Sequence, residues 1–140
     1  MIRKLACLVI IGLFFSCSIA IAETREKEAA AVVAAEQWLS LVDRGQYTES
    51  WKEAAEYFRS AVNQTQWEQM AQATRKPLGK IMSRSARTKM YTTTLPGTPD
   101  GEYVAIEFET SFENKKSAIE TVIPMMDKDG KWRVSGYYIK

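Results

Sequence analysis

Apolar positions recur every three or four residues in the first half of the chain, whereas they alternate with polar positions in its last third. The first period is that of a helix with one buried face, and the second is that of a half-buried strand. A first and longest helix is predicted over residues 24–44, ended by Gly45, which enters the left-handed conformation without steric cost. Its apolar face consists of Ala31, Ala34, Trp38, Leu41 and Val42.

Two further helices are predicted from capping patterns. Ser50 precedes Glu53, and Thr65 precedes Glu68, at the spacing where a hydroxyl and a carboxylate satisfy free backbone N–H groups reciprocally. The third helix is expected to end at the Pro-Leu-Gly run of residues 77–79. One continuous face of the second helix is made of Trp51, Ala54, Ala55, Phe58 and Val62. The inward residues of the third are Trp67, Met70 and Ala71.

Four strands are predicted after Gly79, separated by the turn segments 96–101, 113–116 and 127–130. Such short turns join antiparallel neighbours. The strands are residues 80–95, the alternating series Val104, Ile106, Phe108 and Phe112, residues 117–126, and residues 132–139. Helices followed by a meander predict one α+β domain over residues 23–140, in which a curved four-stranded antiparallel sheet buries one face against N-terminal helices.

The first residues have the form of an export signal. Arg3 and Lys4 precede an unbroken run of apolar or small residues, 5–15, and the small residues of Ala20-Ile21-Ala22 fit a signal peptidase cleft. We expect cleavage after Ala22, which makes residues 1–22 a signal peptide and the protein periplasmic or secreted.

Two alternatives to cleavage remain open. The uncharged run 5–22 approaches the roughly 20 residues of a membrane span and could be retained as an anchor. Cys17 follows the small Ser16 and could carry a lipid, although Phe14 and Phe15 are bulky for such a site. Contact with a membrane is expected only through this segment.

Charge and composition exclude several partners and reactions. The chain has 19 basic and 17 acidic residues, and the excess is Arg3 and Lys4, so the domain after cleavage is neutral and no nucleic-acid partner is expected. Histidine is absent and both cysteines lie in the signal, which removes serine–histidine and thiol catalysis. Without a phosphate loop or a calcium loop, no cofactor or metal is expected.

Charged residues supply one catalytic candidate and two candidate anion ligands. Glu120 lies between Ala118 and Val122, where burial could prepare a carboxylate for proton abstraction, or it could simply face solvent. Arg75 and Arg84 could clamp an anionic ligand. They could also pair with the acidic strand, because basic residues concentrate in 75–89 and acidic residues in 100–113. Asp43 could hold a ligand or accept hydrogen bonds from nearby backbone N–H groups.

Aromatic residues supply the other candidates for a ligand site. Trp38, Tyr47, Trp51 and Tyr137 belong to a rich aromatic set that could line a pocket between the helices and the sheet. The same residues could equally form the core. Tyr47, Tyr137 and Tyr138 are the ones expected to keep a polar edge.

A pattern of residues resembles a bacterial family of small exported proteins of unknown function. It consists of Trp38-Leu39, Asp43-x-Gly45-x-Tyr47-x-x-Ser50-Trp51, Ala54, Phe58, Trp67, Arg75-x-Pro77-Leu78-Gly79 and Arg84. The order of helices and strands is also similar to the cystatin-like, or nuclear-transport-factor-like, cone. Neither resemblance implies an activity, because one fold carries many functions.

Two hypotheses for function follow. The first is a non-enzymatic module that binds a small molecule or a protein partner, including a second copy in a homodimer, through the concave sheet face. The second is a cofactor-free isomerase or hydrolyase that uses a single buried carboxylate, for which Glu120 is the best candidate, assisted by Tyr hydroxyls.

Overall fold

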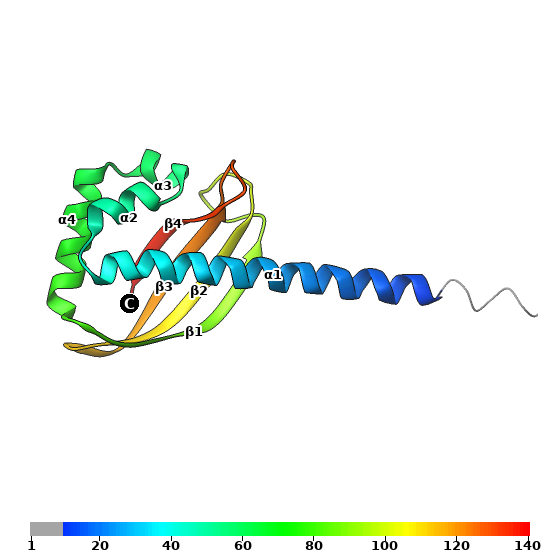
Figure 1. The fold of residues 1–140 in the computed structure, drawn as a ribbon, viewed down its shortest axis with the longest axis horizontal. Helices are drawn as coiled ribbons and strands as arrows, with labels where there is room; N and C mark the ends of the chain where they lie inside the picture. Colours follow the sequence, from blue (N-terminus) through cyan, green and yellow to red (C-terminus); the bar gives the residue numbers. More distant parts are fainter. Residues whose placement is uncertain (1–9) are drawn as a thin grey trace, which may run out of the picture.

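The computed structural model describes residues 10–140, so the start of the predicted signal, residues 1–9, lies outside the described residues. Four α-helices and a short 3-10 helix precede four strands (Figure 1). The helices are α1 (Ile10–Asp43), α2 (Tyr47–Glu53), α3 (Glu56–Ala61), α4 (Gln64–Arg75) and the 3-10 helix η1 (Lys76–Leu78). The strands are β1 (Ile81–Thr92), β2 (Tyr103–Phe112), β3 (Lys115–Met126) and β4 (Trp132–Ile139).

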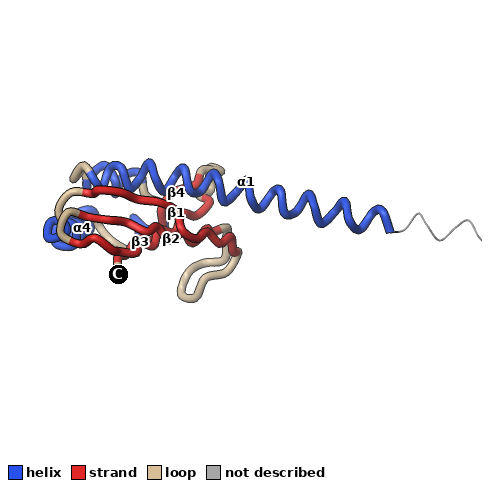
Figure 2. Tube along the Cα trace, turned by 90° about the horizontal axis from the view of Figure 1, so that it is seen from below, coloured by secondary structure: helices blue, strands red, loops and turns tan. Residues whose placement is uncertain are grey.

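The strands form one open antiparallel sheet in the order β1-β2-β3-β4, so the predicted α+β fold with its meander is confirmed. Helix α1 runs along one face of this sheet, and α4 lies beyond one end (Figures 1 and 2). The predicted strand 80–95 is too long at its end, because β1 stops at Thr92.

The core lies between α1 and the inward face of the sheet. Alternate residues of β2 point toward the helices and are fully buried, which is the alternation that the sequence shows. Burial of this apolar surface is the main stabilising contribution to such a fold. The core residues of α1 are Ala31, Ala35, Trp38, Leu39 and Val42, and those of the strands are Val104, Ile106, Phe108, Val122 and Val134.

Helix α1 begins well before the predicted residue 24 and passes without a break through Ala22. Its N-terminal part projects beyond the sheet (Figure 1), and residues 17–23 are all exposed. The first ties to the sheet are an ion pair from Lys27 to Glu102, at 2.7 Å, and a bond from the Tyr91 N–H to Glu28. No helix within residues 10–140 is long and apolar enough to cross a membrane.

The second helix was predicted to be continuous, but the structure has two helices there, α2 and α3. Ala54 and Ala55 are extended, and the Ala55 N–H donates to the Val134 carbonyl of β4 at 2.8 Å. Ser50 is not a cap but lies inside α2, where its hydroxyl donates to the Tyr47 carbonyl. The break therefore ties the helical layer to the edge of the sheet.

The predicted start of the third helix is also wrong. Asn63, not Thr65, caps α4, and Gln66 supplies the reciprocal bond to the Asn63 backbone N–H. An amide pair thus replaces the expected hydroxyl and carboxylate. Met70 was expected inward but is 58% exposed, whereas Trp67 and the small Ala71 are buried.

Candidate functional site

Four charged side chains from four different elements meet between α1 and the sheet. We refer to Asp43, Arg75, Arg84 and Glu120 as the buried ionic cluster. The Arg84 guanidinium donates to both carboxylates, through Nε to Glu120 at 2.7 Å and through Nη1 and Nη2 to Asp43 at 2.7 and 2.9 Å. Arg75 Nη2 donates to Asp43 Oδ1 at 2.7 Å. Asp43 therefore joins the ends of α1 and α4 to β1.

Two neutral hydroxyls complete the hydrogen bonds of Glu120. Thr110 Oγ1 donates to Oε1 at 2.6 Å, and Tyr137 Oη donates to Oε2 at 2.5 Å. The sheet register brings these groups together, because Arg84 stands opposite Thr110 and Tyr137 stands opposite Val122, two residues after Glu120. With Thr110 from β2 and Tyr137 from β4, the cluster contacts every strand.

Burial sets the electrostatics of the cluster. Glu120 has no exposed surface, and the Arg84 and Asp43 side chains are 12% and 15% exposed. Burial alone would raise the pKa of the Asp43 carboxyl, but hydrogen bonds from Arg84 and Arg75 outweigh it and hold the pKa below 3.8. Burial and then the Glu120 charge raise the pKa of the Tyr137 hydroxyl, so it stays protonated and donates.

These contacts correct three sequence interpretations. Glu120 does not face solvent. Arg84 pairs with Asp43 and Glu120, and Arg75 pairs with Asp43, rather than with the acidic strand, whose Glu107 stands opposite the neutral Thr88. Asp43 accepts from guanidinium groups rather than from nearby backbone N–H groups. Glu120 is therefore enclosed by its donors, and reaching its carboxylate would require displacing one of them.

Interlocked aromatic rings occupy the space beside the cluster. Trp38 lies 5.5 Å from Trp67 and 5.3 Å from Tyr137, and Phe58 lies 5.2 Å from Trp67, measured between ring centroids. Both the Trp38 and the Trp67 N–H groups donate to Ser50, which fixes the two indoles. Of the predicted pocket-lining aromatics, Trp38 is thus a core residue, whereas Tyr47, Trp51 and Tyr137 are partly buried against the core.

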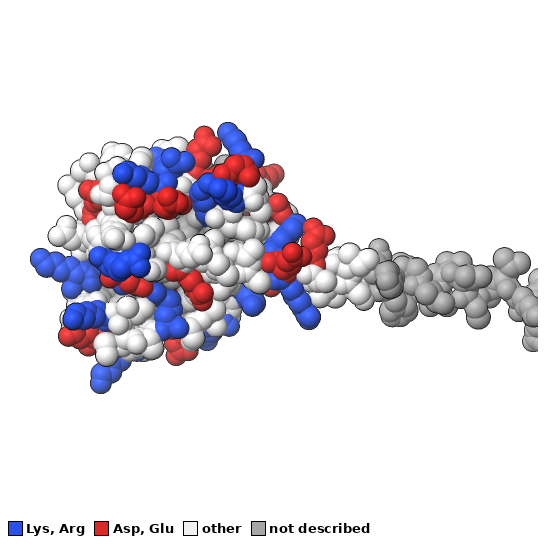
Figure 3. All heavy atoms as spheres, viewed as in Figure 1, with Lys and Arg blue, Asp and Glu red and all other residues white. Residues whose placement is uncertain are grey.

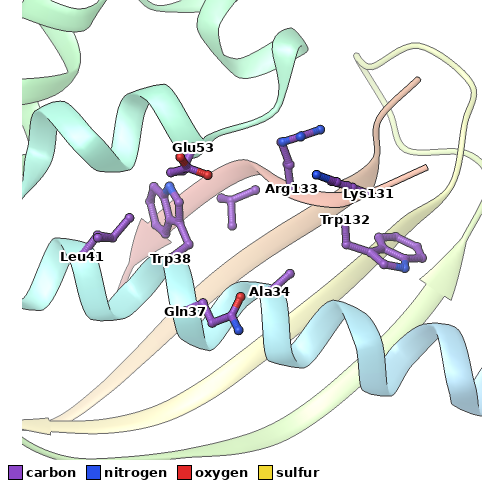
Figure 4. A pocket seen from close by; sticks show the side chains of 9 residues that line it. Ala34, Gln37, Trp38, Leu41, Glu53, Lys131, Trp132 and Arg133 are labelled. Atoms are coloured by element: carbon purple, nitrogen blue, oxygen red, sulfur yellow. The ribbon is translucent and has the colours of Figure 1, made fainter. Parts of the chain in front are cut away.

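An open groove of about 390 Å³ lies on the other side of Trp38, between α1 and the edge strand β4. Trp38 and Trp132 stand at opposite sides of it, with Glu53 close to the Trp38 ring (Figure 4). We call it the indole groove. Gln37, Leu41 and Arg133 also line it, so its walls mix apolar and polar groups.

Comparison with known families matches residues 34–137 to a family described as a protein of unknown function, DUF4019. The matched range covers most of the chain. The chain belongs to the DUF4019 family. No curated protein and no solved structure matches it. The resemblance drawn from the sequence is thus supported at the level of a family without an established function.

Residues of the family-like pattern meet in the folded DUF4019 domain. Asp43, Arg75 and Arg84 form three corners of the buried ionic cluster, although they are far apart in the sequence. Thr110 was missed by the sequence reasoning. The sequence does contain a signal for it, because Thr110 is a polar residue at an inward-facing position of the alternating strand, between Phe108 and Phe112. Within residues 10–140, no group of three His, Cys, Asp or Glu side chains could hold a metal ion.

Proposed function

We propose that this DUF4019 protein is exported and acts in the periplasm or outside the cell as a non-enzymatic binding module. Support for export comes from α1, whose residues 17–23 are all exposed and whose first ties to the sheet begin at Lys27. Cleavage after Ala22 would leave those ties intact. Glu23 and Glu26 would then lie in the first helical turn, where the helix dipole favours acidic side chains.

Mass spectrometry of the protein purified from cells that make the full chain tests the export proposal. We expect the mature chain to begin at Glu23 and Cys17→Ser to leave that mass unchanged. A chain that retains residues 1–22 contradicts the proposal. A chain cut before Cys17, with a lipid attached there, shows the anchored alternative instead.

The indole groove is the observation that carries the binding proposal. Its volume of about 390 Å³ is in the lower part of the range of small-molecule sites. Within the described residues, the side-chain polar groups of Gln37, Glu53 and Lys131 have no hydrogen-bond or ion-pair partner and are available to a ligand. Two indoles with a few polar groups suit a small amphipathic molecule or a short segment of a protein partner.

The surface around the groove supports an uncharged or amphipathic ligand over a polyanion. Basic and acidic side chains are interspersed over the face shown in Figure 3, so their fields largely cancel at a distance. We therefore propose binding at this outer groove rather than on the inward sheet face, because core side chains of α1 already pack against that face.

Titration with the amphipathic fluorophore anilinonaphthalene sulfonate tests the indole groove. We expect saturable binding of the fluorophore, detected by energy transfer from tryptophan. Trp132→Ala should weaken the binding affinity about tenfold, which corresponds to the loss of one anchoring contact. The matched control is Tyr138→Ala, which removes another half-exposed aromatic of β4 outside the groove. Near-ultraviolet circular dichroism confirms that both variants are folded. Equal binding by the two variants contradicts the proposal.

The alternative function is a cofactor-free isomerase or hydrolyase. The complete burial of Glu120, with the Tyr137 hydroxyl on its carboxylate, favours it. Against it, Glu120 already accepts from Arg84, Thr110 and Tyr137 and does not line the indole groove. Glu120→Gln separates the two functions, because a binding module keeps its fluorophore affinity whereas an enzyme loses its turnover.

A further inference from the structure

We propose that the DUF4019 domain has a second binding site, which takes a small oxyanion bearing a carboxylate or phosphate group. The site is an open groove of about 380 Å³ where the end of α1, the end of α4 and the turn after β2 come together. We call it the bend groove. It is separate from the indole groove, and none of its residues is shared with that groove.

The bend groove is built on a tight chain reversal. Gly79 has φ of 73°, and a Cβ at this position would approach Glu113 to 2.9 Å. Backbone bonds hold the reversal against the turn after β2, from Glu113 N–H to the Lys80 carbonyl at 2.8 Å and from Asn114 N–H to the Leu78 carbonyl at 2.9 Å. The groove wall is therefore fixed by main chain rather than by mobile side chains.

Arg75 lines this groove and is the least satisfied member of the buried ionic cluster. Arg84 uses all three of its guanidinium nitrogens, whereas Arg75 uses only Nη2. Its Nε and Nη1 atoms have no hydrogen-bond partner, and they are buried, since only 6% of the residue is exposed. The Phe112 ring, 4.8 Å from Cζ, holds the guanidinium in place. A buried donor without an acceptor is costly and is usually satisfied by a water or a ligand.

Other free donors surround Arg75 at the same groove. The Tyr47 hydroxyl, the Gln72 amide and the amines of Lys76 and Lys80 have no side-chain partner within residues 10–140. The charges of the buried ionic cluster cancel. The other charged residues of the bend groove are Lys76, Lys80 and Glu113, so the groove carries a net positive charge. Abundant donors and a positive charge are what a carboxylate or phosphate needs.

Nuclear magnetic resonance on the purified protein tests the site with two separate probes, inorganic phosphate and succinate, at constant ionic strength. We expect at least one probe to shift the Arg75 Nε–H signal and the Gly79 and Lys80 amide signals in a saturable way. Combined Lys76→Gln and Lys80→Gln should weaken that affinity about tenfold. Lys89→Gln with Lys128→Gln is the matched control, because it removes two exposed amines that lie away from the bend groove.

The two probes distinguish the sources of the oxyanion. Saturation by phosphate alone assigns a phosphate ligand, and saturation by succinate alone assigns a carboxylate ligand. Shifts that rise linearly with both probes, or that sodium chloride reproduces, overturn the proposal, as does an equal loss of affinity in the control variant. The two grooves share no residue, and Trp132 lies outside the bend groove. A negative result for oxyanion binding therefore does not contradict fluorophore binding at the indole groove, and a negative result there does not contradict the oxyanion site.

Discussion

Two arginines of this domain each bind two carboxylates with nearly the same geometry. Arg84 holds Asp43 and Glu120 at 2.7 to 2.9 Å, and Arg133 holds Asp127 and Asp129 at 2.7 to 3.2 Å. The two clusters differ in what they connect. Arg84 joins α1, β1 and β3, whereas Arg133 closes a local turn between β3 and β4.

Burial is the second difference between the clusters. Glu120 is fully buried and the Arg84 side chain is 12% exposed. In the other cluster the Asp129 and Arg133 side chains are 49% and 24% exposed, and only Asp127, at 10%, is comparably buried. Exposed ion pairs contribute little to stability because water and salt screen them. A buried charge that loses its partner is strongly destabilising, because it stays in a medium that solvates it poorly. Equal distances therefore do not imply equal energies, and substitutions should separate the two clusters clearly.

Arg84→Met should produce the largest effect of the substitutions considered. It removes three hydrogen bonds and leaves Glu120 without a positive partner in the interior. We expect the free energy of unfolding to fall by about 3–5 kcal/mol, measured by urea denaturation. Arg133→Met is the matched control and should cost much less. A similar loss in both variants would remove the distinction between the clusters.

Glu120→Gln should have the next largest effect. The amide keeps the shape of the side chain and one acceptor oxygen, but it cannot accept from Arg84, Thr110 and Tyr137 together. We expect a loss of about 1.5–3 kcal/mol, the range for a hydrogen bond to a charged group. Thermal unfolding followed by circular dichroism measures it. A variant as stable as the natural chain would show that the cluster is not held by the Glu120 charge.

The fold was predictable from sequence where local periodicity decides it. The alternating Val104, Ile106 and Phe108 identified the inward face of β2, and short turns identified the meander. Prediction failed where a tertiary contact overrides the local pattern. Ala54 and Ala55 have strong helical propensity, yet they are extended because Ala55 bonds to β4.

The site was predictable only residue by residue. Glu120 was a candidate because it lies in an apolar strand, and Arg75 and Arg84 because their guanidinium groups suit an anion. The meeting of Arg84 with Glu120, however, depends on the registers of β1 against β2 and of β2 against β3. Asp43 was assigned to its own turn, since nothing in the sequence relates it to residues 32 and 41 positions away. Pairing over such separations is set by the packed fold.

The pH dependence of stability should distinguish Asp43 from an ordinary aspartate. Despite its burial, hydrogen bonds from Arg84 and Arg75 hold the folded pKa of Asp43 below its ordinary value of 3.8. The stability that Asp43 contributes is therefore complete above about pH 3.8 and is lost as the pH falls through the folded pKa. The natural chain should therefore lose stability more steeply below about pH 3.8 than Asp43→Asn does. Urea denaturation at a series of pH values measures this. Parallel curves would contradict the predicted role of the two arginines.

Asp129→Asn should have the smallest effect. Hydrogen bonds from Arg133 lower the pKa of Asp129 to about 2, so the associated stability is present above pH 3.8 and is lost as pH falls toward about 2. Because Asp129 is exposed, added salt should screen this contribution, whereas the contribution of Asp43 should persist. Acid denaturation of both variants at low and high sodium chloride compares them directly. If salt removes the Asp43 effect as readily as the Asp129 effect, the buried ionic cluster is not shielded from solvent as its geometry requires.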